Sequence, residues 1–171
     1  MRDTNPQVGI LMGSDSDWEV MSAAATRLET FGVPFEVSVT SAHRAPQRTA
    51  AYASSARDRG LKVLICGAGV AAHLAGVVAA HTTLPVIGVP LESGSLRGWD
   101  ALLATVQMPP GVPVATVAVG KAGAENAAIL AVQILALGDS ELHRRLTELK
   151  VELARQVEEK DARLQQQRQR T

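Results

Sequence analysis

Five short aliphatic runs, separated by segments with helical patterns, restrict the fold of this 171-residue chain most strongly. The runs are bounded by Gly or Pro and span residues 8–12, 35–39, 63–66, 86–89 and 114–119. They are almost continuously apolar, as strands are when helices cover both faces of a parallel sheet. The expected helices between them span residues 17–31, 46–59, 71–81, 99–106 and 124–137. This alternation predicts an α/β fold, a three-layer αβα sandwich around a flavodoxin-like, parallel five-stranded sheet.

The helix boundaries and the C-terminal part of the chain extend this prediction. Gly32 and Gly60 follow expected helices, and Pro46 stands where a first helical turn accepts proline. From Ser140 onward, apolar residues recur every three or four positions among charges of both signs, which predicts a long amphipathic helix over about 140–168. We expect a single domain with its core at about 7–138. The helix is either an exposed element with a solvated face or a surface that packs on a neighbouring subunit.

Charge and composition exclude several classes of partner. The 17 basic and 17 acidic residues cancel, and no Lys or Arg cluster is interleaved with aromatic residues, so we expect no nucleic-acid partner. The uncharged stretch 63–80 contains His73, which is costly in lipid, and is better explained as a buried strand followed by a helix than as a membrane span. With the lone Cys66 and no apolar leader at residues 1–6, this predicts a cytoplasmic protein without membrane contact.

The first strand-to-helix loop, residues 13–17, has the character of a phosphate site. In parallel sheets ligands bind beyond the carboxyl ends of the strands, where such loops lie. Ser14 and its neighbours place hydroxyls and backbone N–H groups at the positive end of a helix, which favours a phosphate. The same residues also serve as ordinary helix caps, so the loop alone leaves both interpretations open. Because a carboxylate repels phosphate, we expect Asp17 to face sugar hydroxyls instead.

The second loop brings a hydroxyl, an imidazole and a guanidinium together in Ser41, His43 and Arg44. The planar fork of Arg44 suits phosphate oxygens. His43 is able to exchange a proton near neutral pH. A solvated His–Arg pair is the alternative, but the position of this loop at the same sheet edge as the first favours a ligand site.

The third loop, residues 67–73, carries glycines that let a ligand approach the backbone closely. Its spacing does not fit the dinucleotide fingerprint, and His73 is either a core histidine or a ligand contact. The sequence has no pattern typical of a zinc or calcium site and no nucleophile elbow for acyl transfer. These residues therefore point to acid/base chemistry on a small phosphorylated molecule, with no metal and no cofactor.

At these positions the sequence resembles the class I PurE family, the N5-carboxyaminoimidazole ribonucleotide mutases of bacterial purine synthesis. The resemblance runs from about residue 8 to 137. It rests on Gly13-Ser14-Asp15-Ser16-Asp17-Trp18, Ser41-Ala42-His43-Arg44, Gly67-Ala68-Gly69, Ala71-Ala72-His73-Leu74, Val106-Gln107-Met108-Pro109, Gly120-Lys121-Ala122-Gly123 and Asn126-Ala127-Ala128.

The resemblance implies a set of roles for the loop residues. Those implied to bind the ribonucleotide are Ser14, Asp17 and Arg44, and those implied to line the pocket are Ser41, Gly69, His73 and Leu74. His43 is implied to be the general acid/base. It protonates the leaving nitrogen as carbon dioxide is released, and it removes the C4 proton after carbon dioxide has been recaptured at C4 of the ring. The resemblance also implies a homo-octamer, without metal or organic cofactor.

Three positions depart from the family pattern: Val70 replaces a usual glycine, Ala75 a usual proline, and Ser95 a usual alanine. We expect activity to survive, with Val70 close to the pocket for carbon dioxide. Three other interpretations remain open. The first is a class II enzyme that carboxylates aminoimidazole ribonucleotide directly. The second is a non-catalytic nucleotide-binding module, and the third is an assembly protein organised by its C-terminal helix.

Overall fold

The structure is a computed structural model that describes residues 5–169. Residues 1–4, on which part of the expectation about a leader rests, lie outside that range. The described chain forms one parallel five-stranded sheet in the order β2-β1-β3-β4-β5. Its strands are β1 (Val8–Met12), β2 (Phe35–Val39), β3 (Val63–Gly69), β4 (Val86–Leu91) and β5 (Ala115–Thr116). This order and direction confirm the predicted flavodoxin-like sheet.

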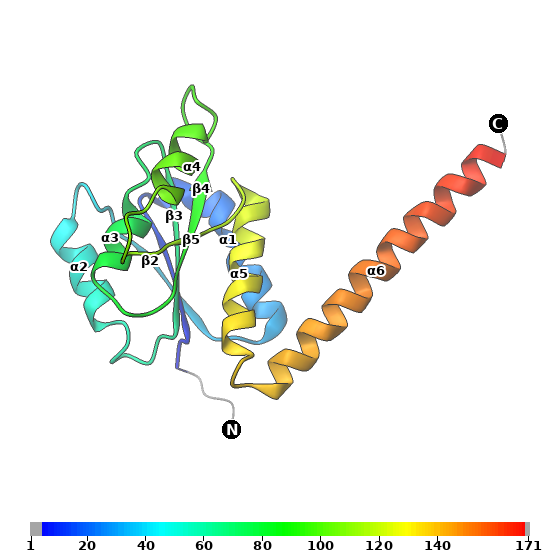
Figure 1. The fold of residues 1–171 in the computed structure, drawn as a ribbon, viewed down its shortest axis with the longest axis horizontal. Coiled ribbons are helices and arrows are strands. Elements are labelled where there is room, and N and C mark those ends of the chain that lie inside the picture. The colour runs from blue at the N-terminus through cyan, green and yellow to red at the C-terminus, as the bar shows by residue number, and fades with distance from the viewer. Residues whose placement is uncertain (1–4, 170–171) are drawn as a thin grey trace.

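Helices cover both faces of the sheet, as Figure 1 shows. They are the 3-10 turn η1 (Asp15–Asp17), α1 (Trp18–Phe31), α2 (Pro46–Ser55), α3 (Leu74–Ala80), α4 (Trp99–Val106), α5 (Lys121–Leu135) and α6 (Ser140–Gln169). Helices α1 and α5 pack together on one face, and α2 and α3 pack on the other. Every residue of β1 and β4 is buried, which explains why these runs lack alternation.

The structure corrects several predicted boundaries at the carboxyl edge of the sheet. Strand β3 continues to Gly69, because Gly67–Gly69 pair with β4, so the predicted third loop is shorter than expected. Helix α3 begins at Leu74 rather than residue 71, and α2 ends at Ser55 rather than 59. Strand β5 covers only Ala115–Thr116 instead of 114–119, since it lies at the sheet edge and pairs with β4 alone.

Gly32 and Pro46 take up the predicted positions at helix ends, whereas Gly60 does not close α2, which ends at Ser55 with Ala56 as its cap. Gly32 closes α1 with a left-handed φ of 64°, a conformation that costs glycine nothing. Pro46 begins α2 in the first turn. Helix α5 runs over Lys121–Leu135, three residues earlier at its start than predicted.

Helix α6 is joined to the core only by its first turns. Leu142 is buried in the core, and Arg145 Nη1 donates a hydrogen bond of 2.9 Å to the carbonyl oxygen of Phe31. Leu146 and Leu149 also pack against the core, and beyond them the helix projects away from the sheet, as Figure 1 shows. Its exposed part carries ion pairs three and four residues apart, such as those of Arg155 with Glu152 and Glu159. Among residues 5–169, no helix is long and apolar enough to cross a membrane.

Candidate active site

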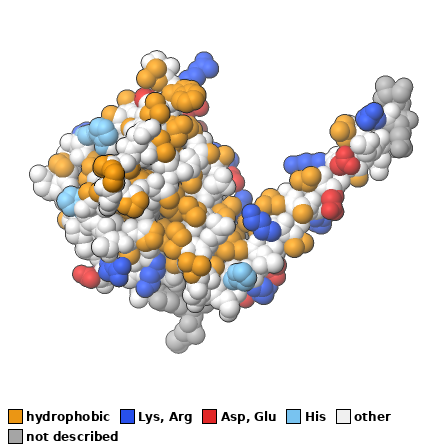
Figure 2. Space-filling view, viewed as in Figure 1, with side chains coloured by type: hydrophobic (Ala, Val, Ile, Leu, Met, Phe, Trp, Pro, Cys, Tyr) orange, Lys and Arg blue, Asp and Glu red, His pale blue; other side chains and the backbone are white. Residues whose placement is uncertain are grey.

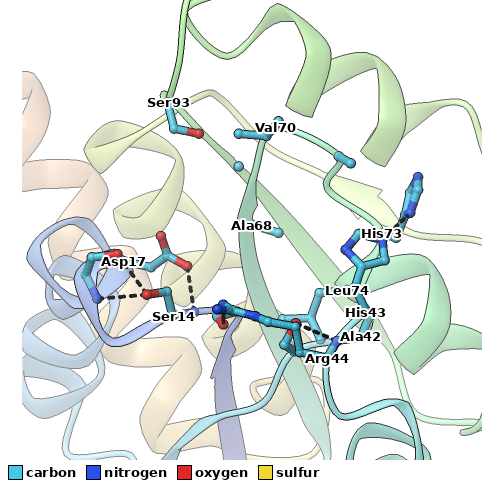
Figure 3. Close-up of a pocket in the computed structure, with 15 residues that line it drawn as sticks. Ser14, Asp17, Ala42, His43, Arg44, Ala68, Val70, His73, Leu74 and Ser93 are labelled. Atoms are coloured by element: carbon cyan, nitrogen blue, oxygen red, sulfur yellow. Dashed lines mark hydrogen bonds between the residues drawn. The ribbon is translucent and has the colours of Figure 1, made fainter.

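One cavity of about 470 Å³ lies at the carboxyl edge of the sheet, where the loops after β1, β2, β3 and β4 meet. Figure 3 shows most of the residues around it. Its lining residues are Gly13, Ser14, Ser16, Asp17, Ser41, Ala42, His43, Arg44, Ala68, Gly69, Val70, Ala71, His73, Leu74 and Ser93. All eight residues singled out from the sequence therefore line one cavity.

The loop after β1 is organised by a capping box. Ser14 Oγ accepts a hydrogen bond of 3.4 Å from the backbone N–H of Ser16, and Asp17 Oδ2 accepts one of 3.1 Å from the N–H of Ser14. The capping interpretation of this loop is thus correct for the free chain. The capping hydrogen bonds still leave a binding surface for a ligand, because Ser14 and Ser16, whose hydroxyl oxygens lie 2.9 Å apart, both line the cavity.

Burial raises the pKa of Asp17 above its ordinary value. The backbone N–H groups of Ser14 and Gly13 act in the opposite direction, and the nearby carboxylate of Asp15 adds to the rise. A carboxyl group that is partly withdrawn from water gains more from a ligand hydroxyl than a fully solvated one. Asp17 is therefore suited to accept hydrogen bonds from sugar hydroxyls.

A buried pair of threonines fixes the turn that carries His43. The hydroxyls of Thr40, at the end of β2, and Thr49, in α2, lie 2.8 Å apart, and both residues are almost fully buried. The N–H of Ala45 donates to the carbonyl of Ser41 at 2.8 Å, which closes the turn between these two elements. Because both ends of the turn are anchored, the histidine it carries is held at a defined place over the sheet edge.

Arg44 links the second loop to the first. Its Nη2 donates a hydrogen bond of 3.2 Å to the carbonyl oxygen of Gly13, and its own backbone N–H donates to Ser41 Oγ at 3.2 Å. In the part of the chain that the structure describes, no carboxylate lies within ion-pair distance of Arg44. Its positive charge is thus available to an anion in the cavity.

The imidazoles of His43 and His73 form a hydrogen bond across the cavity. His43 Nε2 lies 2.7 Å from His73 Nδ1, and the two rings meet nearly edge to face at 79°. In a pair of neutral rings one nitrogen donates and the other accepts, so the tautomer of each ring constrains that of its partner. The sequence left His73 as either a core histidine or a ligand contact. Its side chain is exposed to the cavity, so it is not a core histidine.

Val70 follows β3 in an unusual backbone conformation. Its φ is +53°, a region that β-branched residues rarely enter, and its side chain is 54% exposed at the cavity wall. A glycine takes up this conformation freely, so the departure from the usual glycine at this position places strain next to the site.

Sequence reasoning missed Ser93 as a residue of the cavity. One residue separates it from the end of the buried strand β4. The rule that ligands bind beyond the carboxyl ends of parallel strands, which identified the other loops, therefore applies to Ser93 as well. Among the described residues 5–169, its Oγ is the only buried side-chain oxygen or nitrogen without a hydrogen-bond partner. Ser16, Ala42 and Ala68 also line the cavity and received no role from the sequence.

Comparison with known proteins relates this site to one family. The family described as AIR carboxylase matches residues 7–156. The N5-carboxyaminoimidazole ribonucleotide mutase of Pyrococcus horikoshii is 52% identical over 166 residues, which cover 97% of this chain and 93% of that protein. The protein of the same name from Bacillus subtilis is 59% identical over 143 residues, which cover 84% of this chain and 88% of its own length.

Solved structures agree with the sequence relatives. The crystal structure of Treponema denticola PurE superposes with a TM-score of 0.83 at 30% identity, and the matched region covers 93% of this chain and 98% of that one. Fold, site and sequence similarity thus lead to one conclusion, which is that this chain belongs to the AIR carboxylase family.

Proposed function

We propose that this chain is an N5-carboxyaminoimidazole ribonucleotide mutase, an isomerase of purine biosynthesis. It moves the carboxyl group of that ribonucleotide from the exocyclic nitrogen to C4 of the imidazole ring. The observation that carries the proposal is the placement of His43, 2.7 Å from His73, in the same cavity as the Ser14 loop and Arg44. It is supported by relatives of that name at 52% and 59% identity.

The assignment of roles follows the chemistry of the cavity wall. The uncompensated charge of Arg44 and the hydroxyl of Ser14 bind the phosphate, while Asp17 accepts hydrogen bonds from the ribose. Ser41, Gly69, His73 and Leu74 surround the remaining part of the ribonucleotide. No metal and no organic cofactor takes part in this scheme.

His43 moves the proton in both half-reactions. In the first, the bond between the exocyclic nitrogen and the carboxyl carbon breaks, carbon dioxide leaves, and His43 protonates that nitrogen. In the second, C4 of the ring attacks the carbon dioxide to form a carbon–carbon bond, and the C4 proton passes to His43. The histidine returns to its starting state, so the mutase needs no external acid or base. The hydrogen bond to His73 orients the His43 ring between the two atoms that exchange the proton.

A homo-oligomer completes this site. Retention of carbon dioxide requires a cavity closed to solvent, whereas His43 and His73 are both exposed in the single chain. Large apolar side chains on the loop before α4 and along α4 are also exposed, namely Leu96, Trp99, Leu103 and Val106. Figure 2 shows a face of the globular part on which hydrophobic side chains are frequent and charges few. Patches of this kind mark contacts between proteins.

We place the chain in an octamer, the assembly that the family resemblance implies, with α6 packed on a neighbouring subunit through Leu153, Val157 and Leu164. The residues at about 7–138 form the one domain, and α6 is its extension. The buried, unpaired Cys66 and the role in purine synthesis favour the cytoplasm.

The decisive experiment offers the purified protein two alternative substrates. One is N5-carboxyaminoimidazole ribonucleotide, and the other is aminoimidazole ribonucleotide with bicarbonate. Formation of the C4-carboxylated product is followed in each case. A mutase uses the first, whereas preference for the second pair identifies a direct carboxylase and refutes the proposal.

Replacement of His43 separates the enzyme from a non-catalytic binding module. We expect His43→Asn to lower turnover by about 10²–10⁴-fold, the usual contribution of a general acid/base, while affinity for the ribonucleotide is retained. His143→Asn, on the exposed surface of α6, is the matched control and should leave turnover unchanged. Full activity of the His43→Asn variant would refute the assigned role.

A further inference from the structure

The hydroxyl of Ser93 is buried at the cavity wall without a partner. Ser93 lies two residues beyond the end of β4, and its Oγ is enclosed by protein atoms although the residue lines the cavity. A buried hydroxyl has given up its hydrogen bonds to water, and native proteins rarely leave such a group unpaired. An orphan of this kind at a ligand cavity indicates that the ligand supplies the missing partner.

The neighbouring backbone is adapted to this serine. Gly69, the last residue of β3, pairs in register with Leu91 of β4. A Cβ added at Gly69 would clash with Ser93 Oγ and would lie 3.2 Å from Ser93 Cβ. Ser93 is therefore able to lie over the end of β3 because Gly69 has no side chain. Rotation about one Cα–Cβ bond then moves its hydroxyl between three staggered positions.

Ser93 lies at the opposite end of the cavity from the phosphate-binding groups. Figure 3 shows Ser93 at one end, Ser14 and Arg44 at the other, and Ala68 between them. A ribonucleotide whose phosphate lies at Ser14 and Arg44 extends its imidazole ring over Ala68, between His43 on one side and Ser93 on the other. The group that meets this hydroxyl thus belongs to the ring and its substituents.

We propose that Ser93 is a specificity-determining residue whose hydroxyl donates a hydrogen bond to the carboxylate carried by the imidazole ring. This inference rests on the proposed function. Among the lining residues, Arg44 is the only one with a permanent positive charge, and it lies at the phosphate end. A neutral donor suits a group that changes from an anion to carbon dioxide and back, because a cation would stabilise the carboxylate and oppose its release.

The test compares two ribonucleotides that differ only in the carboxyl group. Dissociation constants are measured by calorimetry for 4-carboxy-5-aminoimidazole ribonucleotide and for aminoimidazole ribonucleotide, with wild type and Ser93→Ala. We expect Ser93→Ala to bind the carboxylated compound about 10-fold more weakly, as expected for the loss of one hydrogen bond to a charged group. Affinity for the compound without the carboxyl group should stay within about 2-fold.

Thermal stability distinguishes this role from a structural one. Alanine removes an unpaired hydroxyl, so the midpoint of unfolding of Ser93→Ala should equal or exceed that of wild type. A structural serine would lower it. Ser95→Ala, at an exposed position of the same loop, is the matched control and should change neither affinity nor midpoint. Ser93→Cys, whose thiol is a weak donor, provides a second variant with the same expected loss of selectivity.

Three results would overturn the inference. They are an equal loss of affinity for both ribonucleotides, no loss for either, and a lower midpoint together with unchanged selectivity. The proposed function fails separately, if wild type binds both ribonucleotides but forms no product. Failure of wild type to bind either ribonucleotide refutes both proposals.

Discussion

The strained backbone of Val70 leads to a prediction that does not depend on the function of the chain. A non-glycine residue in the left-handed region costs roughly 1–2 kcal/mol, and glycine avoids that cost. Glycine in turn loses about 0.4–1 kcal/mol because its unfolded chain is more flexible. At φ +53° the first effect is the larger, so Val70→Gly should be more stable than Val70→Ala by about 1 kcal/mol.

Comparison with alanine isolates the backbone effect. Both substitutions remove the valine side chain, whose partial burial would otherwise contribute to the difference, since it is 54% exposed. Ala71, the next residue, is exposed and is not among the residues with positive φ, so it is the matched control. There the order reverses, and Ala71→Gly should lose about 0.4–1 kcal/mol.

The free energy of unfolding of each variant is measured by urea denaturation, and the midpoint by calorimetry. A difference of 1 kcal/mol corresponds to a shift of roughly 2–4 °C for a chain of this size. If Val70→Ala proves as stable as Val70→Gly while Ala71→Gly shows the ordinary loss, then Val70 stores no backbone strain and the reasoning is wrong.

Two further substitutions test the packing and the electrostatics of the fold. Gly123→Ala should destabilise the protein by about 3 kcal/mol, at the upper end for overpacking, because the added Cβ meets the backbone carbonyl of Ala118. An unchanged thermal midpoint of unfolding would contradict this close approach. Partial burial works to raise the pKa of Glu36, but the hydrogen bond from Tyr52 and the ion pair with Arg59 outweigh it and hold the pKa below 4.5. The ionised carboxylate therefore contributes stability above about pH 4.5 that is lost as the pH falls through the lowered pKa. Glu36→Gln should cost less than about 1 kcal/mol at pH 7, and the cost should shrink as the pH is lowered through that pKa, as followed by thermal unfolding at a series of pH values.

The arrangement of strands and loops was accessible from the sequence. Continuous apolar runs bounded by Gly and Pro identify β1 and β4 as buried parallel strands, because strands covered on both faces lack alternation. The expectation of burial is wrong for β2, which lies at the sheet edge and leaves Val37 and Val39 exposed. The rule that ligands bind beyond strand ends then placed His43, Ser14 and Gly69 at one edge, and the structure brings all three to one cavity.

Element lengths at the sheet edge were less accessible. β3 extends to Gly69 and β5 shrinks to Ala115–Thr116 because each length is set by pairing with β4. Pairing is a property of two strands that are distant in the sequence, so local propensity carries little information about where it ends.

Sequence alone therefore determined the layers, the sheet edge and the residue types that chemistry requires, since these follow from periodicity and from the order of elements along the chain. Tertiary structure decided three features that no local sequence pattern encodes. They are the hydrogen bond between His43 and His73, the left-handed φ of Val70, and the unpaired hydroxyl of Ser93 over Gly69. Each depends on how separate elements pack against one another, which only the folded chain establishes.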